Sequence, residues 1–167
     1  MKAVAAASLK VADEVWVATA LLHREQPERV DFTVAEIVER AERENIVGRL
    51  RPGVYVHASR HAVANLPPSP NTYRMLVATA PDRRRLYRPG DPTDAKRTAS
   101  KAVPRRDELP EKYRPLLDWY AREYAGPTSH RQRHKTDPLL RLIGLGKEIW
   151  KDEPADDYIR RLREEWD

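Results

Sequence analysis

Side chains able to bind a polyanion concentrate in one stretch of this sequence. Residues 46–106 hold 13 basic and 3 acidic side chains, a net charge of +10, and 11 of the 13 basic residues are arginine. The chain of 167 residues as a whole carries only +5, because residues 1–45 and 148–167 are net acidic. Arginine presents a planar fork of donors that matches phosphate and the guanine edge. The stretch therefore indicates a polyanionic partner, with a solvated basic surface as the simpler alternative.

Residues suited to covalent or metal chemistry are sparse. The chain has no cysteine, which excludes disulfides, thiolate metal sites and cysteine nucleophiles. His57 and His61 are four residues apart, as are His130 and His134, but arginines surround both pairs and no third ligand is near. The glycines around Lys147 lack the spacing of a phosphate-binding loop. We therefore expect no enzyme, no catalytic residue, no metal and no cofactor.

The distribution of apolar residues predicts a cytoplasmic protein without a membrane partner. Hydrophobic residues make up 40% of the chain and charged residues 34%. No run approaches the ~18 apolar residues that are needed to span a bilayer. Asp13 and Glu14 interrupt the start too early for a secretory signal. A lean composition of this kind favours one compact domain with extensions.

Two helices are expected near the start of the chain. The spacing of apolar residues predicts a helix over residues 10–24 and a second over residues 33–45. Thr33 and Glu36 have the spacing of a capping box, in which the two side chains satisfy amides of the first helical turn. A short extended piece at residues 30–32 precedes the second helix.

A third helix is expected over residues 54–65, before a pair of prolines ends it. Val54, Ala58 and Ala62 recur at helical spacing and should face inward. The residues that this phase turns outward are His57, Arg60, His61 and Ala64.

A basic hairpin follows the third helix. Residues 72–78 and 83–87 are typical of strands, and Pro81 and Asp82 supply the turn between them. Three helices, a short strand before the second, and a hairpin indicate an α+β, mainly helical fold of the winged helix-turn-helix type, with a helical extension after it. In helix-turn-helix domains the recognition helix enters the major groove of DNA. Any small α+β domain can also show this element order.

The sequence therefore predicts an interface with double-stranded DNA. The candidates for base-edge contacts are His57, Arg60, His61 and Asn65. The candidates for phosphate contacts are Arg49, Arg51, Arg74, Arg83, Arg84, Arg85 and Arg88. This hypothesis requires the cations to gather on one face of the molecule.

Three segments are expected along the chain. Residues 1–90 would form the winged-helix domain. Residues 91–126 would form a basic connector, disordered or following a phosphate backbone, and then a helix at 109–124 whose aromatic stripe packs on the domain. Residues 127–167 would form a hinge and a C-terminal segment too apolar to bury its own side chains. That segment would pack on the domain, on a second copy of the chain, or on another protein.

Short runs of residues in the first part of the chain resemble a family of bacterial winged-helix proteins. These runs are VWVATALL (15–22), FTVAEI (32–37), RPGV (51–54) and YRML (73–76). The resemblance spans roughly residues 8–125, and it implies the winged-helix fold for that part.

The end of the chain resembles the C-terminal tail of VapB-type antitoxins, through GLGKEIW (144–150) and DYIRRLREEW (157–166). This resemblance implies a transcription regulator of a toxin-antitoxin pair, whose tail binds and inhibits a PIN-type toxin nuclease. The side chains expected to anchor such a partner are Ile149, Trp150, Tyr158, Leu162 and Trp166.

Two other functions stay open at this point. One is a protein-interaction module, in which the winged helix binds an acidic protein and no DNA. The other is a subunit of a nuclease, which metal-dependent cleavage by the purified chain would favour.

Overall fold

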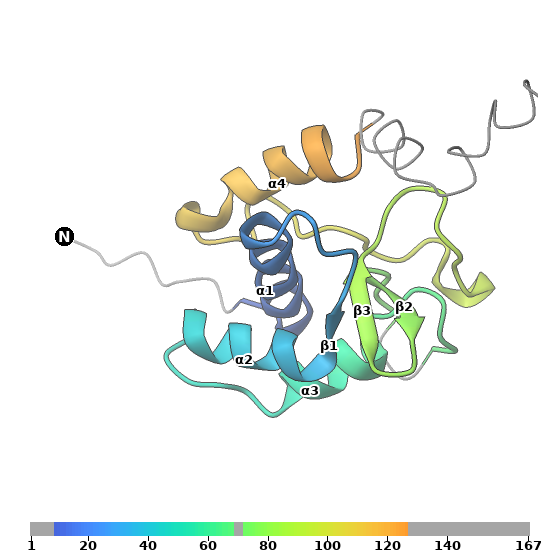
Figure 1. Ribbon diagram of the computed structural model, residues 1–167, viewed down its shortest axis with the longest axis horizontal. Helices are drawn as coiled ribbons and strands as arrows, with labels where there is room; N and C mark the ends of the chain where they lie inside the picture. Colours follow the sequence, from blue (N-terminus) through green and yellow to red (C-terminus); the bar gives the residue numbers. More distant parts are fainter. Residues whose placement is uncertain (1–8, 69–71, 127–167) are drawn as a thin grey trace, which may run out of the picture. The chain divides into compact units, whose positions relative to one another are not determined.

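The computed structural model of the protein describes residues 9–68 and 72–126 (Figure 1). These residues form an α+β fold, which confirms the expected class. The α-helices are α1 (Val11–Glu25), α2 (Val34–Glu44), α3 (Gly53–Val56) and α4 (Pro115–Trp119). The strands are β1 (Phe32–Thr33), β2 (Leu76–Ala80) and β3 (Arg83–Leu86). Short 3-10 turns are η2 (Ala95–Arg97) and η3 (Glu111–Tyr113), and π-helical turns extend α3 and α4 as η1 (His57–His61) and η4 (Tyr120–Tyr124).

Helix α1 lies at the centre of the described fold. Its residues Val15, Trp16 and Ala18 are fully buried. Helices α2 and α3 lie on one side of α1 and α4 lies on the other, so α1 is covered nearly all round (Figure 1). A helix buried in this way is apolar on several faces, and this one has alanine, valine and leucine on them.

The start of α2 is the predicted capping box. The Glu36 amide donates to Thr33 Oγ1 at 3.1 Å, and the Thr33 amide donates to Glu36 Oε2 at 2.7 Å. Arg29 adds a bidentate hydrogen bond to the same carboxylate at 2.6 and 3.0 Å. The Arg29 guanidinium and these donors lower the pKa of Glu36 to about 2. The carboxylate therefore stays charged at the positive end of the helix, where a negative charge is favoured.

The three strands form one antiparallel sheet in the order β1-β3-β2. Phe32 pairs with Arg84, and Leu76 pairs with Leu86. The β2–β3 connection is the predicted hairpin, with its turn at Pro81 and Asp82 and an irregular register between Ala78 and Ala80. The turn is short, and the Asp82 carbonyl accepts the amide of Val34 at the start of α2. The hairpin is therefore held against α2.

Residues 91–126 pack into the same core as the first 90 residues. Leu109, Tyr113, Leu116, Tyr120 and Tyr124 belong to one cluster of buried side chains with α1 and the sheet. The expected helix at 109–124 is present in three consecutive parts, η3, α4 and η4. The expectation of a disordered or phosphate-following connector before it is wrong, because Arg97 is fully buried and the Lys101 ammonium bonds the buried Asp13 carboxylate at 2.7 Å.

A buried histidine joins α1 to the sheet and to η4. The His23 ring packs edge-on against Phe32 with the ring centroids 4.9 Å apart, and its centroid lies 4.7 Å from that of Tyr124. The amide of Leu86 donates to His23 Nε2 at 3.4 Å. Burial, with the positive charges of Arg88 and Arg85 nearby, lowers the pKa of His23 to about 3. The imidazole is therefore neutral in the folded protein at neutral pH.

This histidine predicts how stability depends on pH. Below its ordinary pKa of 6.5, the unfolded chain protonates His23 and the folded protein does not. The unfolded state then binds more protons, so the free energy of unfolding falls as the pH falls, by up to about 1.4 kcal/mol per pH unit for one proton. The carboxyl groups of lowered pKa affect the free energy of unfolding mainly below about pH 5. Between pH 6.5 and about 5, its change with pH therefore comes mainly from histidine.

His23→Gln keeps an acceptor for the Leu86 amide and removes the titration. We expect urea unfolding at a series of pH values to give a flatter slope for H23Q than for the wild type in that window, even where the variant is less stable throughout. Arg24→Gln, at the exposed neighbouring position, serves as the control and should keep the wild-type slope. An unchanged slope in H23Q would contradict the assignment.

Candidate nucleic-acid interface

Helix α3 and its continuation η1 present one face to solvent. Val54, Ala58 and Ala62 are fully buried, which confirms the predicted inward phase. Gly53 permits a close approach to α1, because a Cβ at this position would lie 3.3 Å from a Val11 methyl carbon. The helix is thus held by its inner face against α1 and α2, and the opposite face is free.

Two large hydrophobic residues on that free face were not predicted as site residues. Tyr55 is 60% exposed and Val56 is 40% exposed. The signal was present in the sequence, because a helix that turns positions 54 and 58 inward turns 55 and 56 outward together with 59 and 60. Apolar type alone would have assigned these two residues to the core.

Three of the four predicted base-edge residues lie on the helix, as one exposed cation and two half-buried rings. Arg60 is exposed, and its guanidinium forms no hydrogen bond or ion pair with any residue that the structure describes. His57 and His61 are half-buried, with their ring centroids 5.1 Å apart. The His57 Nδ1 lies 2.9 Å from the Gly53 carbonyl oxygen, and burial lowers the pKa of His57. The two histidines therefore face the protein more than the solvent.

Ala64 and Asn65 do not lie on the helix, which corrects the expected helix end and face. After His61 the chain turns, Val63 forms an isolated bridge with Leu76, and the Ala64 amide donates to the Leu76 carbonyl at 2.7 Å. Asn65 mimics a strand residue: its Nδ2 donates to the Ala78 carbonyl and its Oδ1 accepts the Ala78 amide, both at 2.9 Å. Ala64 is fully buried, and the amide of Asn65 is committed to β2.

Two of the three arginines of β3, Arg84 and Arg85, are buried inside the fold. Arg84 is 4% exposed and Arg85 is 7% exposed. Arg84 Nη2 donates to the Ser59 carbonyl at 2.8 Å and Nη1 to the Ala80 carbonyl at 3.0 Å, and burial lowers the Arg84 pKa. Arg85 forms a bidentate pair with Asp91, with both bonds at 2.6 Å. The prediction that Arg84 and Arg85 bind phosphate is therefore wrong, because a buried guanidinium cannot reach a ligand outside the protein.

Arg51 and Arg83 are paired with carboxylates that come from distant positions. Arg51 Nε donates to Glu14 Oε2 at 2.8 Å, and Nη1 donates to the Leu9 carbonyl at 2.8 Å. Arg83 Nε donates to Asp31 Oδ1 at 2.6 Å, and its side chain keeps 39% of its surface exposed. A carboxylate neutralises each of the two charges, so neither arginine adds much to the positive potential at the protein surface.

Arg74 and Arg88 are half-buried against aromatic rings and carbonyl groups. Arg74 Nε donates to the Ser100 carbonyl at 2.7 Å, and the guanidinium carbon lies 5.4 Å from the Tyr87 ring centroid. Arg88 Nε donates to the Tyr124 carbonyl at 3.0 Å, and its guanidinium carbon lies 3.9 Å from the ring centroid of the same tyrosine. Both therefore act first as packing residues.

The remaining predicted cation, Arg49, is exposed and forms no ion pair within residues 9–68 and 72–126. It precedes α3 in the loop that leads from α2. The residues that we call the α3 face are Arg49, Tyr55, Val56, Ser59 and Arg60. No acidic residue occurs from position 45 to position 81, so nothing in that stretch opposes the two cations.

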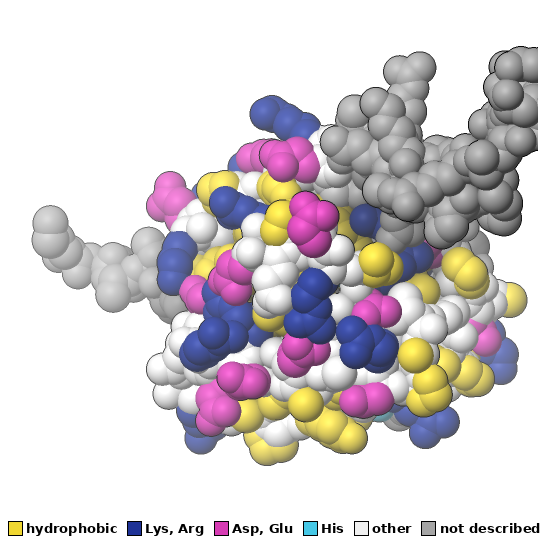
Figure 2. Space-filling view, in the orientation of Figure 1, with side chains coloured by type: hydrophobic (Ala, Val, Ile, Leu, Met, Phe, Trp, Pro, Cys, Tyr) yellow, Lys and Arg dark blue, Asp and Glu magenta, His cyan; other side chains and the backbone are white. Residues whose placement is uncertain are grey.

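The surface of the protein agrees with the finding that many of the predicted arginines are buried or paired. Figure 2 shows side chains of both charges mixed over the visible face, where positive and negative groups alternate. Hydrophobic side chains gather along the lower margin, where α3 lies in Figure 1. The visible face is not one extended basic surface, and Arg84 and Arg85 are buried. The candidate interface is therefore a smaller surface that combines apolar and basic groups.

Arg97 fixes the end of the helix that carries this face. Its Nη2 donates to the Arg60 carbonyl at 3.2 Å, and its Nη1 donates to the His61 carbonyl at 2.8 Å. Three further carbonyl acceptors belong to Leu66, Pro67 and Tyr73. Carbonyls at a helix C-terminus carry partial negative charge, which favours a cation there. Arg97 thus ties the helix end to the loop after it and to the approach to β2.

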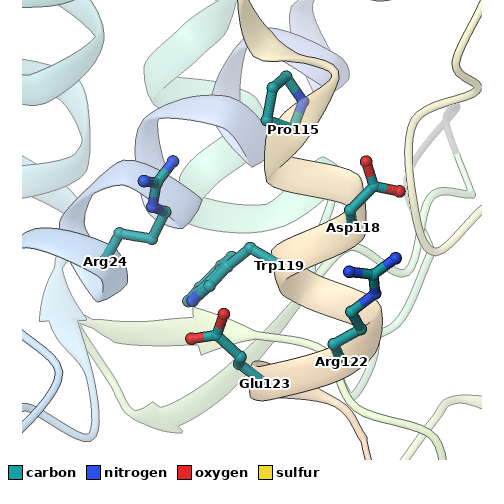
Figure 3. Close-up of a pocket in the computed structure, with 6 residues that line it drawn as sticks. All are labelled: Arg24, Pro115, Asp118, Trp119, Arg122 and Glu123. Atoms are coloured by element: carbon teal, nitrogen blue, oxygen red, sulfur yellow. The ribbon is translucent and has the colours of Figure 1, made fainter.

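A second surface feature is a shallow pocket beside α4 (Figure 3). It is lined by Arg24, Pro115, Asp118, Trp119, Arg122 and Glu123. Its two arginines are balanced by two carboxylates, and Asp118 is already paired with Arg106 at 2.6 Å. The pocket does not offer the net positive charge that a polyanion needs.

Among residues 9–68 and 72–126, no group of three or more histidine or acidic side chains could hold a metal ion. None of the helices described is long and apolar enough to cross a bilayer. Comparison of the chain with protein-family models, with curated proteins and with solved structures gave no match.

The role of Arg97 predicts a large effect of its removal. Arg97→Leu leaves five carbonyl groups without this donor, and we expect a loss of at least about 3 kcal/mol in the free energy of unfolding, measured with urea. Lys96→Ala, at the exposed neighbouring position, should change it by less than about 0.5 kcal/mol. Equal stability of R97L and K96A would show that the helix end is held by other contacts.

Proposed function

We propose that residues 9–126 form a winged helix-turn-helix domain that binds double-stranded DNA through the α3 face. The order α1, β1, α2, α3, β2, β3 is the order that the sequence analysis associates with this fold, and the strand order β1-β3-β2 places the hairpin beside β1. A helix packed on two others with its outer face free suits the major groove, which admits one α-helix. A DNA-binding function would place the protein in the cytoplasm.

The observation that carries the proposal is the charge of the α3 face. Arg49 and Arg60 are exposed, and neither forms an ion pair with any residue that the structure describes. Exposed arginines attract phosphate, and arginine also binds the guanine edge. Tyr55 and Val56 add exposed apolar surface between them in sequence, which suits contact with base edges and sugars.

The small number of free cations sets the strength of the electrostatic contribution. Each phosphate neutralised gives a slope of about −0.9 in the logarithm of affinity against the logarithm of salt concentration. Two cations therefore give a slope near −2, which is shallow for a DNA-binding protein. The hairpin adds little, because its tip is short and bonded to α2.

The test is the double variant R49A/R60A of the full chain. We expect its affinity for duplex DNA, measured by fluorescence anisotropy in ~50 mM salt, to fall at least tenfold, since one arginine–guanine contact contributes about 1–3 kcal/mol. The salt slope should become shallower by about 1 to 2.

The matched control is R24A/R122A, which removes two exposed arginines from α1 and η4 and causes the same change in net charge. It should bind duplex DNA like the wild type. Equal affinity of both double variants would mean that DNA is not bound through the α3 face.

A protein partner is the second candidate function, and one observation favours it. Tyr55 and Val56 expose apolar surface that a protein groove could cover, and Val47, in the preceding loop, is 37% exposed. Absence of measurable affinity of the wild type for duplex DNA would favour this candidate.

For the C-terminal segment we propose the role of an antitoxin tail that binds a PIN-type toxin nuclease. The support is the resemblance of residues 144–166 to VapB-type tails, together with the apolar and arginine-rich character of the sequence. The partner-binding residues named above lie outside the described residues.

This role is tested by co-expression of the full chain with the product of the adjacent gene. W150A/W166A should lose co-purification of that product, because aromatic anchors dominate such interfaces. Y55A removes an exposed aromatic residue of the α3 face and should retain it. Retention of the product by W150A/W166A would contradict the proposal.

A further inference from the structure

The α3 face carries a narrow set of chemical groups. Val56 and Tyr55 offer apolar surface, and Arg60 offers a guanidinium. The Ser59 hydroxyl donates to the Val56 carbonyl at 3.2 Å within the helix. The face thus has a cationic donor and apolar surface, and neither a carboxylate nor a carboxamide.

This set limits which bases the helix can read in the major groove. Cytosine is read through its amino group by an acceptor such as Glu or Asp, and adenine is read by the carboxamide of Asn or Gln. The carboxamide of Asn65, five positions after Arg60, is committed to Ala78. Guanine is read by arginine, and the thymine methyl group is read by apolar contact.

We propose, on the basis of the DNA-binding function above, that the α3 face reads guanine and thymine in the major groove: Arg60 bonds the N7 and O6 of a guanine, and Val56, supported by Tyr55, packs on a thymine methyl group. Val56 and Arg60 are four positions apart and share one face. The α-helical rise of 1.5 Å per residue sets an upper limit of about 6 Å on their separation along the axis, because the π-helical turn His57–His61 rises less per residue. With base pairs ~3.4 Å apart, the guanine and the thymine lie within about two steps of each other.

The expected effects follow from the two contacts. Removal of one methyl group from an apolar contact is worth roughly 0.8 kcal/mol, which is a change of about fourfold in affinity. Loss of a bidentate arginine–guanine contact changes affinity by roughly 10- to 100-fold.

The experiment begins with selection of duplexes by the full chain from a random-sequence pool. Selected duplexes are then synthesised with deoxyuridine for thymine, which lacks the methyl group, or with 7-deazaguanine for guanine, which lacks N7. For the wild type we expect a fourfold loss with deoxyuridine at one position, and a loss of at least tenfold with 7-deazaguanine within about two steps of it.

Each base analogue should leave the affinity unchanged in the variant that lacks the side chain contacting that base. V56A should bind the thymine and deoxyuridine duplexes equally, and R60A should bind the guanine and 7-deazaguanine duplexes equally. V30A is the control for V56A, because Val30 is a 59% exposed valine in the loop before β1, and it should keep the full sensitivity to deoxyuridine.

The failures of the two proposals are distinguishable. Wild-type binding that depends on Arg49 and Arg60 but ignores both base analogues overturns the reading of guanine and thymine and leaves DNA binding intact. Enrichment of no duplex, with equal affinity of R49A/R60A and R24A/R122A, overturns both proposals.

Discussion

The guanidinium of Arg97 lies fully buried among backbone carbonyls of three segments: the end of η1, the loop that follows it, and the approach to β2. A buried cation without a carboxylate partner is costly unless its donors are satisfied, and here all three guanidinium nitrogens donate to carbonyls. Burial lowers the pKa of Arg97, while the negative charge of Asp94 opposes that effect. Because Arg97 lies in residues 91–126, that segment helps to hold α3 and η1 in position.

Internal use of arginine is a general feature of this fold. Sheet and loop segments of irregular geometry leave backbone carbonyls that need donors, and a guanidinium supplies five N–H groups from one side chain. Arg84 and Arg97 satisfy carbonyls, whereas Arg51 and Arg85 bond carboxylates. The net charge of a stretch of sequence is therefore a poor guide to the charge that the same stretch presents to a partner.

A small face of mixed character changes the expected balance of DNA recognition. Proteins that neutralise many phosphates gain sequence-independent affinity, and those with few must gain more from base-edge contacts. If the proposed function holds, the α3 face belongs to the second kind, because Arg49 and Arg60 are its only cations and Tyr55 and Val56 are its exposed apolar residues. Selectivity for a DNA sequence would then depend on a few side chains in the major groove, and little on the electrostatic potential of the domain.

The sequence by itself determined the local elements: helices α1 and α2, the Thr33–Glu36 capping box, the hairpin turn, and the inward phase of Val54, Ala58 and Ala62. These depend on residues a few positions apart, whose interactions repeat with the period of the backbone. Only the tertiary structure decided which arginines are available, because their partners are distant in sequence: Glu14 lies 37 positions from Arg51, and Arg60 lies 37 positions from Arg97. Whether a side chain faces solvent depends on what packs opposite it, and no local pattern contains that information.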